Sequence, residues 1–425
     1  MDYTPFTIAV YARLNDIKPT RRYVVYVALV GAMMAMTQFG VVIARKSLGA
    51  SELMVTFLAM STPVANLSSL WWARLIKGRD QRIIIIFVVS IGLLVIASGG
   101  WLFSINHLLI IHVTWFTAFA LLRTSESRIL QQHVSSGRTG AIFGKGASMR
   151  MIVVAIISAI AGFWMENVEG GYRDIYPIIA LIGVVAMVSI ASIQTSEKGI
   201  TTPMPINRHF FLDPLRKVIT LLKRRRDFLR YEMIFMIFGG AFMMTGPVVP
   251  IYLVDELNLG YDIIGLTRGT VSQITGVLAM LIFGRIFDRT TPHRLAVGLF
   301  SAMSLYPVML IFTGMVDGLF RTIMISVTFA YFGAVMSGVL ILWQLASIRF
   351  SGDEDAGIYH SVHLTSTGVR GLVAPLLGYA IMTIAGIKAA LITSASLFLF
   401  AGIMMGVMRW IDSRTGEWHS LRIEN

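Results

Sequence analysis

The chain has 425 residues, of which 56% are hydrophobic and 14% are charged, and its mean hydropathy is +0.72. A soluble domain carries more charge, so this composition excludes an ordinary soluble protein. The sequence has no cysteine, which excludes disulfide bonds, thiol catalysis and cysteine-based metal sites. The net charge of +13 would suggest nucleic acid as a partner of a soluble protein, but cytoplasmic loops of membrane proteins are also basic, and we favour that explanation.

Twelve apolar segments are long enough to cross a bilayer, which takes about 20 residues per helix. The first six begin near Tyr23, Met54, Ile83, Leu108, Ala141 and Ile175, and the second six near Tyr231, Ile263, Leu295, Phe320, Ile358 and Ala389. A long polar segment, residues 195–230, separates the two sets. We therefore predict an all-α integral membrane protein with twelve transmembrane helices in two six-helix bundles, residues 1–194 and 231–425, joined by a cytoplasmic linker.

The basic residues predict the orientation of these spans. They cluster before span one, between spans two and three, and in the linker. The connections on the opposite side carry only a few: Arg45, Lys46, Arg173, Arg321 and Lys388. Because Lys and Arg collect in cytoplasmic loops, we expect both termini in the cytoplasm and the protein in a bacterial inner membrane.

The linker contains one segment with the pattern of a surface helix, residues 213–227. Asp213 is placed to cap this helix, and Pro214 suits its first turn. One face is basic, and the other carries apolar residues at i, i+3, i+4 and i+7: Leu215, Val218, Ile219 and Leu222. We expect this helix to lie on the anionic inner leaflet of the membrane, and binding of a regulatory protein is the alternative.

A short loop between spans eight and nine reads GRIFDRTTPHR, residues 284–294. It resembles the cytoplasmic loop motif of the major facilitator superfamily, in which a glycine precedes Asp-Arg and a further basic residue. Those places are filled by Gly284, Asp288, Arg289 and Arg294. The resemblance implies that they hold the two bundles together on the cytoplasmic side. The corresponding loop of the first half departs from the pattern, because Ser69 replaces the glycine.

Two further segments carry the same resemblance. Residues 353–378 end in APLLG, which is similar to the Gly/Pro-rich stretch of span eleven in this superfamily. Residues 250–266 look like the exit of span seven and the entry of span eight. The resemblance implies a secondary transporter, in which two bundles rock about a central site and expose it to each side of the membrane in turn. It does not identify the subfamily.

Charged side chains at membrane depth are costly and therefore mark candidate functional sites. Glu126 lies in the cytoplasmic half of span four, at a depth similar to that of Lys145 and Arg150 in span five. One interpretation is an ion pair that locks the first bundle, and the other is a proton or substrate relay through Glu126. We keep Glu126 as a candidate for proton coupling and Arg150 as a candidate for substrate binding.

Arg370 lies about 18 Å along span eleven, near the membrane midplane, at 1.5 Å per residue. The second half of the sequence shows no acidic residue at matching depth. An unpaired guanidinium there would need a water-filled cavity or an anionic ligand. Substrate contact and helix packing through backbone carbonyls are both consistent with this position.

Neutral polar residues near the midplane are further candidates for substrate binding: Gln38, Gln273, Tyr331 and Thr367. A single buried polar side chain can equally serve as a hydrogen bond between helices. His360 and His363 are one turn apart near the cytoplasmic start of span eleven. Because histidines titrate near neutral pH, both are candidates for proton coupling, and ordinary interfacial histidines are the alternative.

These observations predict a transporter rather than an enzyme. The sequence has no phosphate-binding loop for ATP, no metal-ligand cluster and no paired carboxylates for acid–base catalysis, and we expect no cofactor. Because buried cations outnumber carboxylates, we expect the substrate to be a small organic anion or a polar or amphiphilic molecule, with proton coupling as an option. We also expect the protein to be a monomer. The alternatives are a drug or cation exporter of the same fold and a non-transporting membrane receptor or scaffold.

Overall fold

The computed structural model describes residues 19–133, 139–193, 206–352, 354 and 356–415. The helices of the first half are α2 (Pro19–Lys46), α3 (Glu52–Leu67), α4 (Ser69–Ile76), α5 (Gln81–Ala97), α6 (Ile105–His133), α7 (Thr139–Asn167) and α8 (Tyr172–Ala191). A helix in the linker, α9 (Arg208–Arg224), follows. The helices of the second half are α10 (Arg226–Ile251), α11 (Tyr261–Ile264), α12 (Ser272–Arg289), α13 (Pro292–Met303), α14 (Leu305–Thr313), α15 (Gly318–Ser351), α16 (Ala356–Ala385) and α17 (Ile387–Thr415).

Twelve helical stretches among the described residues are long and apolar enough to cross a membrane. Several are built from two consecutive helices, such as α3 with α4 and α13 with α14. Two include a wider π-helical turn, at Tyr252–Glu256 after α10 and at Gly265–Val271 between α11 and α12. The twelve predicted spans are therefore confirmed.

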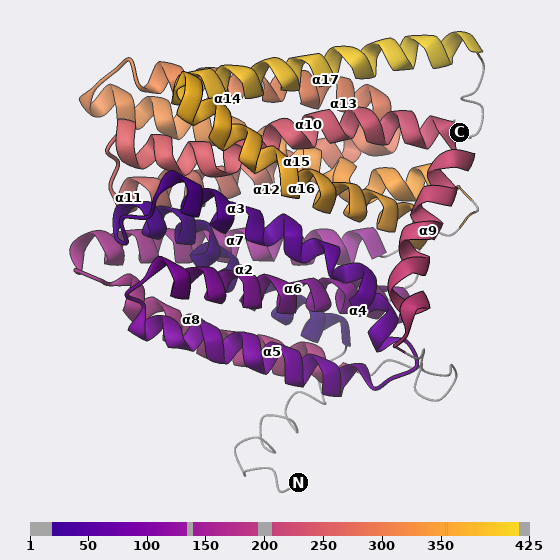
Figure 1. The fold of residues 1–425 in the computed structure, drawn as a ribbon, viewed down its shortest axis with the longest axis horizontal. Coiled ribbons are helices and arrows are strands. Elements are labelled where there is room, and N and C mark those ends of the chain that lie inside the picture. Colours follow the sequence, from indigo (N-terminus) through magenta and orange to yellow (C-terminus); the bar gives the residue numbers. More distant parts are fainter. Residues whose placement is uncertain (1–18, 134–138, 194–205, 353, 355, 416–425) are drawn as a thin grey trace, which may run out of the picture.

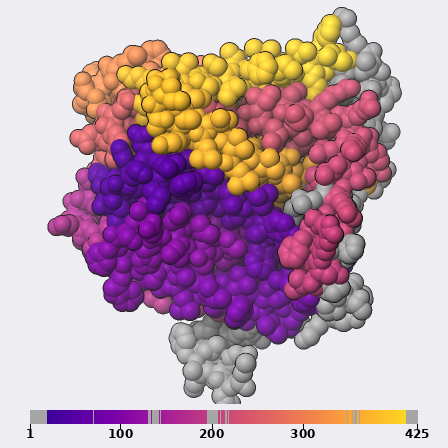
Figure 2. Space-filling model, in the orientation of Figure 1, coloured from indigo at the N-terminus to yellow at the C-terminus, as the bar shows by residue number. Residues whose placement is uncertain are grey.

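The spans pack as two groups. Helices α2 to α8 contact one another, and so do helices α10 to α17. Figure 1 shows the first group in indigo to magenta and the second in red to yellow, with helix axes running side by side. The two groups meet along an extended seam in the space-filling view (Figure 2), where α3 packs on α16 and α7 packs on α12. The predicted all-α fold of two six-helix bundles is confirmed, while its boundary at residue 194 lies outside the described residues.

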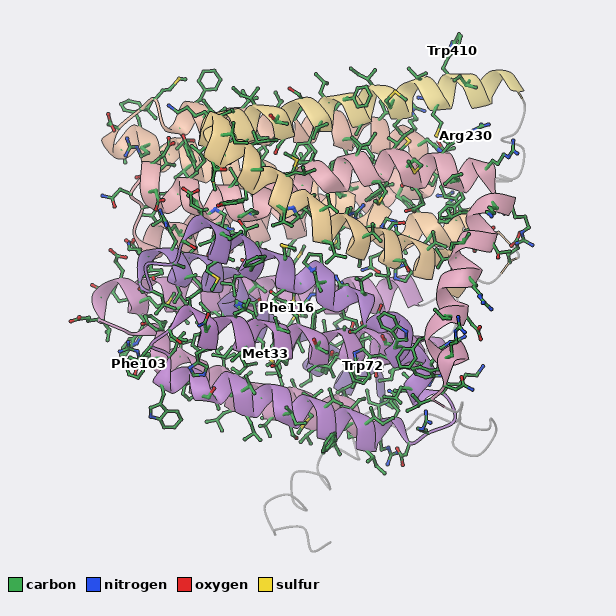
Figure 3. The ribbon with its side chains drawn as sticks, in the orientation of Figure 1. Met33, Trp72, Phe103, Phe116, Arg230 and Trp410 are labelled. Carbon is green, nitrogen blue, oxygen red and sulfur yellow. The ribbon has the colours of Figure 1, made fainter. Side chains whose placement is uncertain are left out.

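The surface of both bundles is apolar along the length of the helices. Leu94 of α5 is 71% exposed and Leu181 of α8 is 69% exposed. Trp410 of α17 points away from the body of the protein in Figure 3. Exposed apolar surface of this extent is unfavourable in water and is satisfied by contact with lipid chains. The surface thus agrees with an integral membrane protein.

Helix α9 lies across one end of both bundles, nearly at right angles to their helices (Figure 1). We call this the linker end, and we call the opposite end of the molecule the far end. In Figure 3, Trp72 and Arg230 lie at the linker end and Phe103 lies at the far end. Different kinds of contact join the two bundles at the linker end and at the far end, and these contacts bear on the functional site.

Helix α9 begins at Arg208, and its cap is Asn207, whose side chain accepts the backbone N–H of Phe210 at 3.1 Å. The predicted start at Asp213 is therefore wrong, because the earlier asparagine satisfies the free N–H groups of the first turn. Asp213 instead lies inside the helix and forms a 3.6 Å ion pair with Arg74 of α4. The linker helix thus starts one and a half turns earlier than the pattern indicated.

The proline that suggested a helix start has another consequence here. Because Pro214 has no N–H, the carbonyl of Phe210 four residues earlier lacks its usual helical donor. Arg74 donates to this carbonyl at 2.7 Å, so the contact between α4 and α9 uses a backbone group that the helix leaves free. The predicted apolar face is only partly buried, since Val218 is buried and Ile219 is 54% exposed.

Candidate functional site

The first bundle buries one carboxylate close to span one. Glu126 of α6 accepts a hydrogen bond from the Tyr26 hydroxyl of α2 at 2.7 Å, and both side chains are buried. Among the described residues, neither Lys145 nor Arg150 forms an ion pair with Glu126, although Arg150 lies close enough to interact with it electrostatically. The expected ion pair is therefore replaced by a hydrogen bond to a tyrosine.

A cation–π contact crosses from the first bundle to the second in the linker half of the protein. The guanidinium of Arg123 in α6 lies 5.1 Å from the centre of the Trp343 ring in α15. Arg123 and Glu126 are neighbours on one helix, so this contact places the buried carboxylate next to the seam between the bundles. Such a contact is worth about 0.5–2 kcal/mol, depending on how well water is excluded.

The second bundle holds a buried acid–base pair. Nδ1 of His363 in α16 lies 2.8 Å and 3.1 Å from the two carboxylate oxygens of Glu232 in α10. The two side chains are 3% and 4% exposed. The sequence analysis placed His363 near the cytoplasmic start of span eleven but did not pair it with Glu232, which stands at the start of span seven. Their equal depth was the signal that could have done so.

Arg370 lies between α16 and α10 rather than facing open space. It donates to the carbonyl of Phe235 at 3.0 Å and to the hydroxyl of Thr367 at 3.0 Å. Its guanidinium fills the space above Gly239, where an added Cβ would lie 2.2 Å from Cζ. Glu232 is close enough to interact with it electrostatically, so an acidic residue does accompany Arg370 after all. In this conformation the guanidinium supports helix packing, and its contact with a substrate stays a prediction.

The other predicted substrate contacts do not form one cluster. Tyr331 of α15 donates to the carbonyl of Ala302 in α13 at 2.6 Å. Thr367 donates to the carbonyl of His363 at 2.9 Å. Gln38 of α2 and Gln273 of α12 are half-buried in different bundles. His360 of the proton-coupling set lies one turn before His363 and contacts Ser347 at 3.4 Å.

The loop motif between α12 and α13 is open in this conformation. Asp288, Arg289 and Arg294 are exposed, and within the part of the chain that the structure describes they form no ion pair. A Cβ added at Gly284 would meet nothing within 4 Å, so no helix approaches closely there. The end of α12 is held instead by Arg349 of α15, which donates to the carbonyl of Phe287 at 2.8 Å. The gating role of the motif stays a prediction.

Polar contacts between the bundles close the far end. Arg45 of α2 donates through Nε to both carboxylate oxygens of Asp255 at 2.9 Å. Glu166 of α7 accepts the backbone N–H of Tyr261 at 2.6 Å. Lys46 lies 3.3 Å from Glu166 and donates to a carbonyl of the second bundle. The sequence analysis missed this closure, because it considered only charges at membrane depth.

The π-helical turn at Gly265–Val271 continues this closure along α7. Thr270 donates to the carbonyl of Ala155 at 2.7 Å. An added Cβ at Gly162 would lie 2.6 Å from the carbonyl oxygen of Tyr261, so the two backbones touch. Close approach of this kind depends on small residues, which line helix interfaces in membranes.

Two six-helix bundles, closed at one end by contacts that cross between them and carrying buried ionisable groups near the seam, define a membrane transporter rather than an enzyme. The chain belongs to the Major Facilitator Superfamily, whose family model matches residues 23–371. The family expected from the sequence motifs is therefore confirmed.

Comparison with curated relatives gives similarity to a multidrug resistance protein. The chain is 22% identical over 381 residues to the multidrug resistance protein MdtG of Escherichia coli strain 55989, covering 87% of this chain and 83% of the relative. The match to MdtG of Escherichia coli strain HS is 24% over 214 residues, covering 49% of this chain and 47% of the relative. In this match and in those to MdtG of several other Escherichia coli strains, the chain thus spans about half the length of the relative.

Comparison with solved structures supports the fold. A POT family transporter in complex with a thioalcohol-conjugated peptide has a TM-score of 0.70 and 12% identity, covering 93% of this chain and 95% of that one. The nucleoside transporter NupG has a TM-score of 0.65 and 12% identity, covering 94% and 99%. At this identity the likeness shows the fold alone.

Proposed function

We propose that this chain exports amphiphilic, drug-like molecules in exchange for protons. Membership of the superfamily supports transport of a small molecule. The similarity to a multidrug resistance protein favours the exporter, which the sequence analysis held as an alternative, over the organic anion that it held as the main prediction.

The contact between Glu126 and Tyr26 is the observation that carries this proposal. The prediction of an anion depended on the excess of buried cations over carboxylates, and span one, residues 23–44, has no carboxylate of its own. In the structure, the Glu126 carboxylate reaches span one from the neighbouring helix, through the hydroxyl of Tyr26. A carboxylate beside the seam can hold a proton or balance a cationic substrate, and either one displaces the other. Competition between the substrate and a proton for this carboxylate is sufficient to couple export of the substrate to entry of the proton.

The proposed setting is a bacterial inner membrane with the linker end in the cytoplasm. The side of α9 away from the bundles exposes two apolar residues, Phe211 and Ile219, and two basic residues, Arg216 and Lys223. Apolar and basic side chains together suit the surface of an anionic leaflet. We place the substrate contacts in a monomer at the residues predicted from the sequence: Gln38, Arg150, Gln273, Tyr331, Thr367 and Arg370.

Transport by the purified chain in proteoliposomes tests the proposal, with a fluorescent lipophilic cation as the probe. We expect a pH gradient to drive accumulation of the probe, and Glu126→Gln to abolish this accumulation, because glutamine neither titrates nor carries a charge. Glu169→Gln is the matched control, since Glu169 lies exposed in the turn after α7, and it should transport at the rate of the unaltered chain.

A second probe decides between the alternatives. A fluorescent organic anion, moved in place of the cation under the same gradient, would return the assignment to the anion transporter. If neither probe moves and the protein only binds a protein partner, the chain is a receptor or scaffold and the transport proposal is wrong.

A further inference from the structure

In the buried pair of Glu232 and His363, one ring nitrogen of the histidine takes no part in the contact. A carboxylate only accepts hydrogen bonds, so Nδ1 of His363 is the donor in the contact with Glu232. Nε2 of the same ring is buried and, among the described residues, has no hydrogen-bond partner. In the neutral imidazole this atom carries the lone pair, and a further proton binds there.

The charge around the pair is balanced before that proton arrives. Glu232 carries a negative charge, and the nearby guanidinium of Arg370 carries a positive one. Arg370 is joined to the pair through Thr367, which receives a hydrogen bond from Arg370 and donates to the His363 carbonyl. A proton on Nε2 therefore leaves the cluster with one uncompensated positive charge in a region of low dielectric.

The same cluster touches the contact between the bundles. The His363 ring lies 5.8 Å from the Trp343 ring, and the indole N–H of Trp343 points to Thr367 at 3.4 Å. Trp343 in turn carries the guanidinium of Arg123 from the first bundle. One tryptophan thus contacts both a histidine of the second bundle and a cation of the first.

We propose that the Glu232–His363 pair is a proton-binding site, and that a proton on Nε2 of His363 loosens the Arg123–Trp343 contact and separates the bundles at the linker end. A hydronium ion in the surrounding water gives up the proton, so one O–H bond breaks as the N–H bond forms at Nε2, and a water molecule is left. The added positive charge repels Arg123, because both cations then lie close to the Trp343 ring. This inference rests on the proposed exchange for protons, and it identifies a second protonation site and what that site does.

Several other ionisable groups surround the pair. They are His360 and Arg370 on α16, Tyr231 on α10, Arg123 on α6, His293 on α13, Arg409 on α17, and Arg225 between α9 and α10. Helix α15 contributes Trp343, and the one charged residue of α3, Glu52, lies at its far end. The carboxylate in direct contact with the imidazole is that of Glu232, which supplies the nearest counter-charge for a proton on that ring.

A distance measurement at the linker end tests the inference without a substrate. The sequence has no cysteine, so Lys77→Cys and Arg285→Cys supply the only labelling positions, one exposed in each bundle. Spin-label distances in lipid nanodiscs are then measured between about pH 8 and about pH 5, the interval in which histidine titrates. We expect a shift of the population towards longer distances as the pH falls, with a single midpoint.

Three variants test whether the shift in distance depends on the Glu232–His363 pair. His363→Gln should keep the short distance at every pH, whereas His107→Gln, at the far end of the first bundle, should retain the shift. Glu232→Gln should move the midpoint to lower pH, because the imidazolium loses its counter-charge. Size-exclusion profiles and melting temperatures check that each variant is folded, and Glu232→Gln keeps the test decisive if His363→Gln is not.

A pH-dependent shift that persists in His363→Gln with the same midpoint overturns the inference, as does a distance that does not change with pH in the unaltered chain. The transport assay separates this outcome from failure of the proposed function. Transport of the cationic probe without a change in distance removes only the role of the pair. A pH-dependent distance in a protein that moves no probe removes only the proposed function.

Discussion

Arg370 packs so closely against Gly239 that a single methyl group added at Gly239 should destabilise the protein. In Gly239→Ala, the new Cβ would lie 2.2 Å from Cζ of Arg370 and 2.4 Å from Nη1. Carbon atoms in good contact are about 3.5–4.0 Å apart, so the guanidinium has to move. Moving it breaks the hydrogen bonds to the Phe235 carbonyl and the Thr367 hydroxyl.

The size of the effect follows from those two bonds. A hydrogen bond from a charged group contributes about 1.5–3 kcal/mol, and alanine gains about 1 kcal/mol over glycine inside a helix. Loss of one bond should therefore lower the free energy of unfolding by about 0.5–2 kcal/mol, and loss of both by about 2–5 kcal/mol. The next residue offers a matched control, because a Cβ at Gly240 would lie 4.0 Å from that of Ala374, which is an ordinary contact.

Thermal unfolding in detergent, followed by tryptophan fluorescence, measures the difference. We expect Gly239→Ala to melt below the unaltered chain and Gly240→Ala to melt at or above it. Adding Arg370→Ala to Gly239→Ala should cost less than the sum of the single changes, because the guanidinium no longer competes for the space. The packing argument is refuted if Gly239→Ala is as stable as Gly240→Ala.

Two further outcomes are expected from other contacts. Asp255→Asn weakens the bidentate pair with Arg45 at the far end, by about 0.2–1 kcal/mol for a partly exposed pair, and should raise the labelling rate of a cysteine placed behind that closure; an unchanged rate would count against the closure. Gly333→Ala should lower the melting temperature, because its Cβ would lie 2.0 Å from a backbone oxygen of α12, whereas Gly284→Ala, which meets nothing within 4 Å, should melt at or above the unaltered chain. Equal melting temperatures for the two alanine variants would contradict the packing described for α12.

The spans could be predicted from the sequence because a lipid-facing helix needs a run of apolar residues, whatever its neighbours are. Span one was predicted to begin near Tyr23 and its helix begins at Pro19. The last span was predicted near Ala389 and its helix begins at Ile387. Whether a segment can span the membrane depends on that segment alone, so it can be predicted from the sequence of that segment.

The start of α9 shows where local rules compete. Asp213 and Pro214 form a good helix start by themselves, and the pattern that follows them is amphipathic. Asn207 offers an earlier cap, and Arg74 compensates for the proline by donating to the Phe210 carbonyl. Because Arg74 is distant in the sequence, the local pattern could not show that the proline would be accepted inside the helix.

The partners of the buried charges depend on two coordinates, depth along a helix and rotation about its axis. The sequence supplied depth, and by that measure Glu232 and His363 stand at the same end of spans seven and eleven. It did not supply rotation, so the carboxylate that points at the imidazole was not paired with it. The partner of Glu126 was missed, since Tyr26 is uncharged and lies on another helix. Since an unpaired charge in a membrane is costly, two ionisable groups at one depth on spans that can pack together are better considered as a pair first and as separate sites second.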